Sequence, residues 1–171
     1  MHFRKLHLLL PALLATTAMA EPGIQSQPDM QMHDAACRLG QYSPIVGIWT
    51  GNLSFTLPGL GQATVLIAVN QGGTFMETDS IDLNNTVGTA TPGYAAWKAL
   101  DCRHYALTIN KTLYNGGQFS QILLPGTLEL SEDGQTLTIS LKQHVFNQSG
   151  TEVATGTVTG SAKRANAGNG E

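Results

Sequence analysis

Between Gly47 and Arg164 the chain alternates apolar and polar residues in stretches of about ten residues, each followed by a turn of Gly, Asn or Pro. This is the pattern of a β-strand with one buried face, because successive side chains of a strand point to opposite sides. The unit recurs roughly eight times, and short connections make consecutive strands antiparallel neighbours. The pattern therefore predicts an all-β fold, an antiparallel up-and-down barrel of about eight strands without exposed edges.

One of the expected strands departs from this regular pattern. Residues 119–130 contain Pro125 and Gly126 near their middle. Proline cannot donate a hydrogen bond to a neighbouring strand, and glycine has no side chain to pack. We therefore expect a bulge or an edge-like bend here, and this expectation bears on whether the barrel closes.

The first twenty residues have the composition of a secretory signal peptide. Arg4 and Lys5 precede an apolar run over residues 8–14, and Ala18 and Ala20 supply small residues for a cleavage site. We expect cleavage after Ala20 and a secreted or periplasmic protein. The apolar run is shorter than the roughly 20 residues that a membrane-spanning helix needs, so we expect no membrane span.

The charge of the remaining chain argues against two classes of partner. Removal of Arg4 and Lys5 leaves seven of the nine basic residues against all twelve acidic ones, a net charge of about −5. A protein of this charge is poorly suited to bind nucleic acid or an anionic membrane surface.

The mature chain divides into three parts by composition. Residues 21–43 contain several Pro and Gly residues and room for one short helix, which predicts an irregular or short-helical arm. Residues 44–164 form the predicted barrel, and residues 165–171 form a disordered tail. We expect the arm to lie across, or plug, one end of the barrel.

Cys37 and Cys102 are the two cysteines of the chain. In an oxidising compartment an even pair of cysteines predicts a disulfide. Such a bond would join the arm to the barrel and stabilise the fold by roughly 2–4 kcal/mol. A redox or nucleophilic cysteine is the alternative, but the chain has no Cys-x-x-Cys motif.

The first and last strands of the expected barrel resemble those of the lipocalin and calycin families. Gly47-Ile48-Trp49 is similar to their Gly-x-Trp signature, and the pair Lys163-Arg164 follows the last strand, where those folds place a basic side chain over that tryptophan. The resemblance implies that Gly47, Trp49 and Arg164 close the barrel. A cation over an indole ring contributes roughly 0.5–2 kcal/mol.

A larger part of the chain, residues 43–164, resembles a set of uncharacterised exported bacterial calycin-like proteins, with allene oxide cyclase-like barrels as more distant comparisons. This resemblance implies a fold and no activity. The residues that carry it are Pro44-Ile45-Val46-Gly47-Ile48-Trp49, Gly73-Thr74-Phe75-Met76-Glu77-Thr78-Asp79-Ser80, Thr91-Pro92-Gly93-Tyr94-Ala95-Ala96-Trp97-Lys98, Tyr105-Ala106-Leu107-Thr108 and Gly156-Thr157-Val158-Thr159-Gly160.

Two kinds of polar side chain are candidates for chemistry. Glu77 and Asp79 share one face of a predicted strand, with Cβ atoms about 6–7 Å apart. Such a pair serves acid–base work on a glycosidic bond or, together with Asp82, holds Ca²⁺. We favour the plainer interpretation, a solvated strand face. His104 and His144 lack the spacing of zinc ligands. We therefore predict no catalytic residue, no metal and no cofactor.

The leading functional hypothesis is an exported barrel that binds a small apolar molecule in its interior. About eight strands leave room for one small ligand. The alternative is a solid core filled by the same aromatic side chains. The residues expected to line the interior are Trp49, Phe55, Phe75, Trp97 and Tyr105.

Two further hypotheses come from other classes, although we expect a binding protein rather than an enzyme. One is a cyclase or isomerase that shapes a lipid-like substrate, with Glu77, His104 and Tyr105 as candidate groups, by analogy of fold. The other is an exported protease inhibitor or interaction module that acts through the arm over residues 21–43.

Overall fold

The computed structural model describes residues 43–83 and 88–165. This part of the chain contains no helix long and apolar enough to cross a membrane. Its regular structure consists of β-strands, which are β1 (Gly47–Phe55), β2 (Gln62–Val69), β3 (Thr74–Asp79), β4 (Thr89–Ala90), β5 (Gly93–Ala99), β6 (His104–Asn115), β7 (Gln118–Leu130), β8 (Thr136–Phe146) and β9 (Glu152–Arg164).

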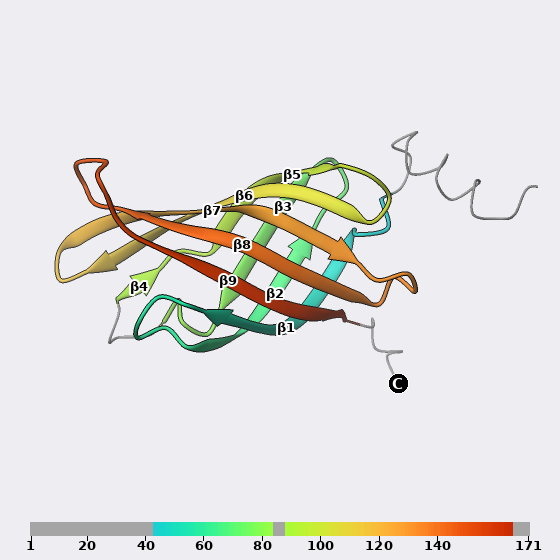
Figure 1. Ribbon diagram of the computed structural model, residues 1–171, viewed down its shortest axis with the longest axis horizontal. Helices are drawn as coiled ribbons and strands as arrows, with labels where there is room; N and C mark the ends of the chain where they lie inside the picture. The colour runs from blue at the N-terminus through green and yellow to red at the C-terminus, as the bar shows by residue number, and fades with distance from the viewer. Residues whose placement is uncertain (1–42, 84–87, 166–171) are drawn as a thin grey trace, which may run out of the picture.

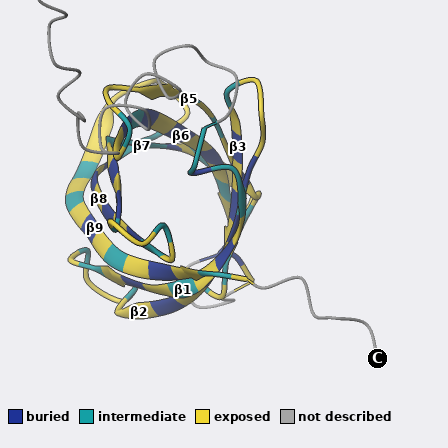
Figure 2. Ribbon diagram, turned by 90° about the vertical axis from the view of Figure 1, so that its right-hand side faces the viewer, coloured by how far each residue is buried: buried dark blue, intermediate teal, exposed yellow. Residues whose placement is uncertain are grey.

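Eight of these strands close into a ring. Each pairs with antiparallel neighbours in the order β1, β2, β3, β5, β6, β7, β8 and β9, and β9 pairs back onto β1. The short β4 pairs with the C-terminal part of β6, at Leu113 and Tyr114, beyond the residues of β6 that pair with β5. Figure 1 shows the long hairpins, and the end-on view in Figure 2 shows the closed ring. The predicted up-and-down barrel of eight antiparallel strands is thus confirmed.

The expected bulge at Pro125 and Gly126 was wrong. Strand β7 runs through both residues, and its partners on β6 stay in one register from His104 to Asn115. The register against β8 is also the same on the two sides of Pro125. Proline lacks an N–H, so it interrupts the hydrogen-bond ladder with β8 without adding a residue to the strand. The irregularity of this sheet lies instead between Val145 and Phe146, where β8 faces β9.

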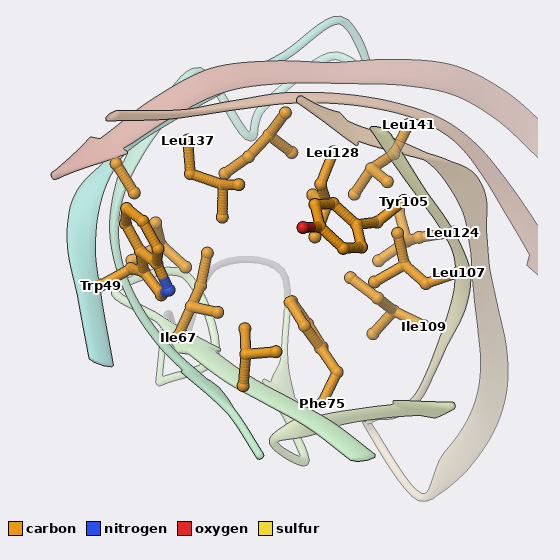
Figure 3. Close-up of a cluster of buried hydrophobic side chains, with 14 of the residues drawn as sticks. Trp49, Ile67, Phe75, Tyr105, Leu107, Ile109, Leu124, Leu128, Leu137 and Leu141 are labelled. Carbon is orange, nitrogen blue, oxygen red and sulfur yellow. The ribbon is translucent and has the colours of Figure 1, made fainter. Parts of the chain in front are cut away.

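Alternate residues of every long strand point into the barrel and form its core. Figure 3 shows the side chains from facing strands meeting in the interior, among them Ile67, Phe75 and Leu128. Strand β6 shows the alternation well, because every second residue is buried or half-buried and the residues between them are mostly exposed. Its inward residues are Tyr105, Leu107, Ile109, Lys111 and Leu113.

One end of the barrel is closed by side chains and by the segment before β1. The indole N–H of Trp49 donates to the carbonyl of Ile45 at 3.0 Å, and both residues are fully buried. The Arg164 guanidinium carbon lies 4.2 Å from the centre of the Trp49 ring. Arg164 also donates to the carbonyls of Pro44, Val46 and Gly134. These contacts tie the chain before β1, the β7–β8 turn and the end of β9 together.

Gly47 is required at this closed end for two reasons. Its φ of +148° is a backbone conformation that side chains disfavour. A Cβ atom at this position would also lie 2.6 Å from Nη1 of Arg164. The glycine thus makes room for the guanidinium that covers Trp49.

Several predictions concern residues beyond the described part of the chain. The described part excludes the signal peptide over residues 1–20, the arm over 21–43 except its last residue, and the tail after residue 165. Cys37 also lies outside the described part. The Cys37–Cys102 disulfide therefore stays a prediction. Cys102 lies in the β5–β6 turn, where its carbonyl accepts a hydrogen bond from the Tyr105 hydroxyl at 2.8 Å.

Candidate functional site

A cavity of about 250 Å³ occupies the barrel on the side away from Trp49. It reaches the surface beside the β1–β2 turn, because Pro58 is exposed and also lines it. Its wall is made largely of aliphatic and aromatic side chains from every strand of the ring except β5, and from the turns. They include Leu53, Phe55, Leu57, Val65, Ile67, Phe75, Ile109, Leu113, Ile122, Leu124, Leu128, Ile139, Leu141, Val145, Ala154 and Val158.

Four charged side chains form a cluster in the wall of this apolar cavity. The Lys111 ammonium on β6 lies 3.0 Å from Glu77 Oε1, 3.0 Å from Asp79 Oδ2 and 2.5 Å from Asp82 Oδ1. Each of the four side chains is at most 7% exposed. We call these four residues the buried charge cluster. Charges removed from water to this degree are found in proteins when they are paired.

The backbone around β3 positions the two aspartates. Asp82 Oδ2 accepts a hydrogen bond from the Thr78 hydroxyl at 3.1 Å and from the Asp79 amide at 3.0 Å. Asp79 Oδ1 accepts from the amide of Ile81 at 2.8 Å. The turn after β3 therefore folds back over the end of the strand and brings Asp82 to the same point as Asp79. Both aspartates are held by hydrogen bonds as well as by Lys111.

Glu77 is held less completely. Its Oε1 makes an ion-pair contact with Lys111, but neither of its oxygens has a hydrogen-bond donor among the described residues. Gly93, its partner on β5, leaves room for the carboxylate, since a Cβ there would lie 2.2 Å from Oε1. Burial raises the pKa of Glu77 to about 7, against the opposing attraction of Lys111. Glu77 is thus a carboxyl group that changes charge near neutral pH.

Lys111 remains charged in this environment. Burial acts to lower its pKa, but attraction to Glu77 and Asp79 and the hydrogen bond to Asp82 outweigh burial, so the pKa of Lys111 lies above its ordinary value. An ammonium group has three N–H donors. Three carboxylates surround this one, each with an oxygen within 3.0 Å of Nζ.

Gln143 adds a second unpartnered acceptor to the cavity. It points inward from β8, between Leu141 and Val145, and is 4% exposed. Its side-chain oxygen has no hydrogen-bond donor among the described residues. A buried polar atom without a partner is costly, and such atoms are uncommon in folded proteins. The cavity therefore combines apolar walls with buried hydrogen-bond acceptors that lack a partner, at Glu77 and Gln143.

The carboxylates also have the composition of a cation site. One oxygen from each of Glu77, Asp79 and Asp82 lies within 4.8 Å of the others. Lys111 Nζ, however, is within 3.0 Å of all three groups. The protein's own ammonium thus stands in the position that a bound cation would take between them.

The structure separates the five aromatic residues expected to line the interior into two groups. Phe55 and Phe75 line the cavity. Trp49 and Tyr105 are fully buried and lie outside the cavity wall, as does the half-buried Trp97, whose ring packs edge-on against Tyr105 with centroids 5.6 Å apart. Large rings thus fill one part of the barrel, and mostly aliphatic side chains bound the space in the other.

The groups suggested for an enzyme do not meet in the cavity. Glu77 lines it, but His104 and Tyr105 do not. Nδ1 of the exposed His104 lies in hydrogen-bond contact with Asp101 Oδ2 at 2.8 Å. His144 makes a separate pair with Glu152 at 2.5 Å. The two histidines are therefore partnered with nearby acids at the barrel surface.

Sequence reasoning placed Glu77, Asp79 and Asp82 together but favoured a solvated face, which was wrong. It missed Lys111 and Gln143 altogether. A signal for both was present, because each occupies an inward position within an alternating apolar face. A lysine or glutamine in such a position predicts a buried polar partner.

Comparisons with known proteins give this chain a structural neighbour of low similarity. No family model matches it, and no curated protein matches it. Among solved structures, one described as "Structure of EF1p2_mFAP2b bound to DFHBI" aligns with 16% sequence identity and a TM-score of 0.40. The alignment covers 78% of this chain and 99% of that one.

Proposed function

We propose that this protein is an exported barrel that binds one small, largely apolar molecule in its cavity. The observation that carries the proposal is a space of about 250 Å³ with mainly aliphatic walls that reaches the surface beside Pro58. Ligand sites are typically apolar cavities with a few convergent polar groups. The buried charge cluster and Gln143 are such groups.

The size of the cavity limits the ligand. An engineered apolar cavity of about 150 Å³ holds benzene, so a space of this size should accept a molecule on the order of ten non-hydrogen atoms. Naphthalene and 1-octanol have this size. A long-chain fatty acid is too large to enter completely.

The proposal is tested by filling the cavity from within. Leu141 is buried in the cavity wall, and Leu66 is exposed on the outer face of β2. We expect wild type to bind naphthalene saturably, measured by equilibrium dialysis. Leu141→Phe should weaken this binding at least tenfold because the ring takes up ligand space, and Leu66→Phe should not change it.

Two results would overturn the proposal. One is the absence of saturable binding of both naphthalene and 1-octanol by wild type. The other is equal affinity in wild type and Leu141→Phe, which would place the bound molecule elsewhere on the protein. Ile122→Phe changes a second residue of the wall and serves if the first variant does not fold.

Export is the second part of the proposal, and it rests on the sequence of residues 1–20. Expression of the full chain in a bacterial host should yield protein outside the cytoplasm with Glu21 as its first residue. The measurement is the intact mass of the exported protein. The same spectrum reports the Cys37–Cys102 bond as the loss of two hydrogens, and a full-length mass in the cytoplasm would contradict export.

A further inference from the structure

We infer that the cavity selects a ligand with an amine head group on an apolar body, the ammonium donating to Glu77 and Gln143. This inference rests on the proposed function, because it specifies the molecule that the cavity holds. Its basis is the kind of polar atom that the cavity leaves without a partner, together with the charges around it.

The charge around the cavity favours a cation. Three carboxyl groups line it, at Glu77, Asp79 and Asp82, against the one ammonium of Lys111. With all three ionised, the cluster carries a net charge of −2, and it sits in an apolar wall where charges interact strongly. A ligand that brings a positive charge would reduce this imbalance.

The atoms without partners are acceptors. Both carboxylate oxygens of Glu77 and Oε1 of Gln143 are buried and have no hydrogen-bond donor in the described part of the chain, although Glu77 Oε1 is in ion-pair contact with Lys111. Both residues are 4% exposed and line the cavity. An ammonium supplies up to three N–H donors, so it can satisfy acceptors that a ligand without donors leaves unpaired.

Lys111 gives no counterpart for an anionic ligand. Its Nζ lies within 3.0 Å of one oxygen of each of the three carboxylates, so an anion near this ammonium would also lie near three negative groups. A ligand carboxylate in the cavity would meet the unpaired oxygens of Glu77 and Gln143 and the net negative charge of the cluster. The cavity should therefore reject an anion of the same size and shape.

The experiment compares head groups on one tail. Octylamine, 1-octanol and octanoate are titrated by calorimetry into protein purified from the full chain at pH 8. At this pH Glu77, with its pKa raised to about 7, is mostly ionised, and octylamine and octanoate are also charged. We expect octylamine to bind at least tenfold more tightly than 1-octanol and octanoate to bind most weakly.

Variants locate the head group. Glu77→Gln should weaken octylamine at least tenfold and change 1-octanol less than threefold. Glu132→Gln removes the same charge from an exposed turn residue and should change neither. Gln143→Leu tests the second acceptor and should weaken octylamine binding several-fold. It keeps the inference testable if Glu77→Gln does not fold.

The outcomes separate this inference from the proposed function. Saturable 1-octanol binding equal to or tighter than octylamine binding overturns the amine preference and leaves the apolar cavity function standing. If both Glu77→Gln and Gln143→Leu still prefer octylamine as wild type does, the amine binds elsewhere, and this result also overturns the inference. If none of the three molecules binds, the proposed function fails, and the inference fails with it.

Discussion

At the scale of single residues, Lys111 holds the most unusual position in the molecule. It brings a positive charge into an apolar barrel and meets three carboxylates there. Removing one partner from a buried charged network costs more than the network itself contributes, because the charges left behind have no counter-ion. The four members of the buried charge cluster therefore depend on one another.

We predict that Lys111→Met destabilises the protein by about 3–5 kcal/mol, since it leaves the carboxylates unpaired in the barrel. Lys142→Met is the matched control, because Lys142 points outward from β8 and is exposed. It should change the free energy of unfolding by less than about 0.5 kcal/mol. Urea denaturation measures both variants, and equal stability of the two would show that the cluster is hydrated.

The raised pKa of Glu77 predicts a pH dependence of stability. The folded protein holds the Glu77 proton up to about pH 7, whereas the unfolded chain releases it near pH 4.5, the ordinary value. Between these values the folded state binds more protons, so stability falls as pH rises. The ionisation of Glu77 should lower the free energy of unfolding by on the order of 3 kcal/mol between pH 4.5 and 8.

Glu77→Gln tests this dependence because glutamine does not titrate. As pH rises from about 5 to 8, Glu77→Gln should gain about 1 kcal/mol or more in unfolding free energy relative to wild type. Glu132→Gln should show no such trend. A difference that stays constant over this range would show that Glu77 is ionised throughout.

At the scale of elements, β7 and β8 approach closely where Gly126 faces Leu141. A Cβ at Gly126 would lie 2.2 Å from the carbonyl oxygen of Ser140 and 2.7 Å from the Cα of Leu141. Backbone atoms cannot turn away as the end of a flexible side chain does. The glycine therefore allows two long strands to stay in register at a tight point of the barrel.

We predict that Gly126→Ala destabilises the barrel by about 1–3 kcal/mol or more, through the shift of β8 that the added methyl group forces. The control is Thr127→Ala, the next residue of β7, whose side chain is exposed. Thermal unfolding should show a clear loss for the first variant and a small change for the second. An alanine at position 126 that leaves the melting temperature unchanged would contradict the close approach.

At the scale of the whole molecule, the barrel depends on the pairing of its first and last strands. Strand β9 pairs with β1 from Phe55 to Trp49, and Arg164 stands at the end of this seam. Its guanidinium covers Trp49 and donates to backbone carbonyls on both sides of the closure. One side chain thereby joins parts of the chain that lie more than one hundred residues apart.

We predict that Arg164→Met lowers the free energy of unfolding by about 2–4 kcal/mol, because carbonyls of the seam lose a charged donor and Trp49 loses its cation. Lys163→Met removes the neighbouring charge, which is exposed, and should have little effect. Hydrogen exchange should also show faster opening of β1 and β9 in Arg164→Met. Similar exchange in both variants would show that the strands alone hold the seam.

The sequence by itself determined that this chain forms an antiparallel barrel, because alternation with period two and short Gly-rich turns leave few other ways to bury one face of each strand. It did not determine the path of β7, since a proline can interrupt the hydrogen-bond ladder without adding a residue to the strand. It also placed Glu77 and Asp79 on one strand face without showing that this face is the interior. Only the tertiary structure decided that, because the charge that makes their burial possible, Lys111, lies on β6, two strands away in the ring. Which side chains pair between strands depends on how the strands meet in space, and the spacing of residues within one strand does not show it.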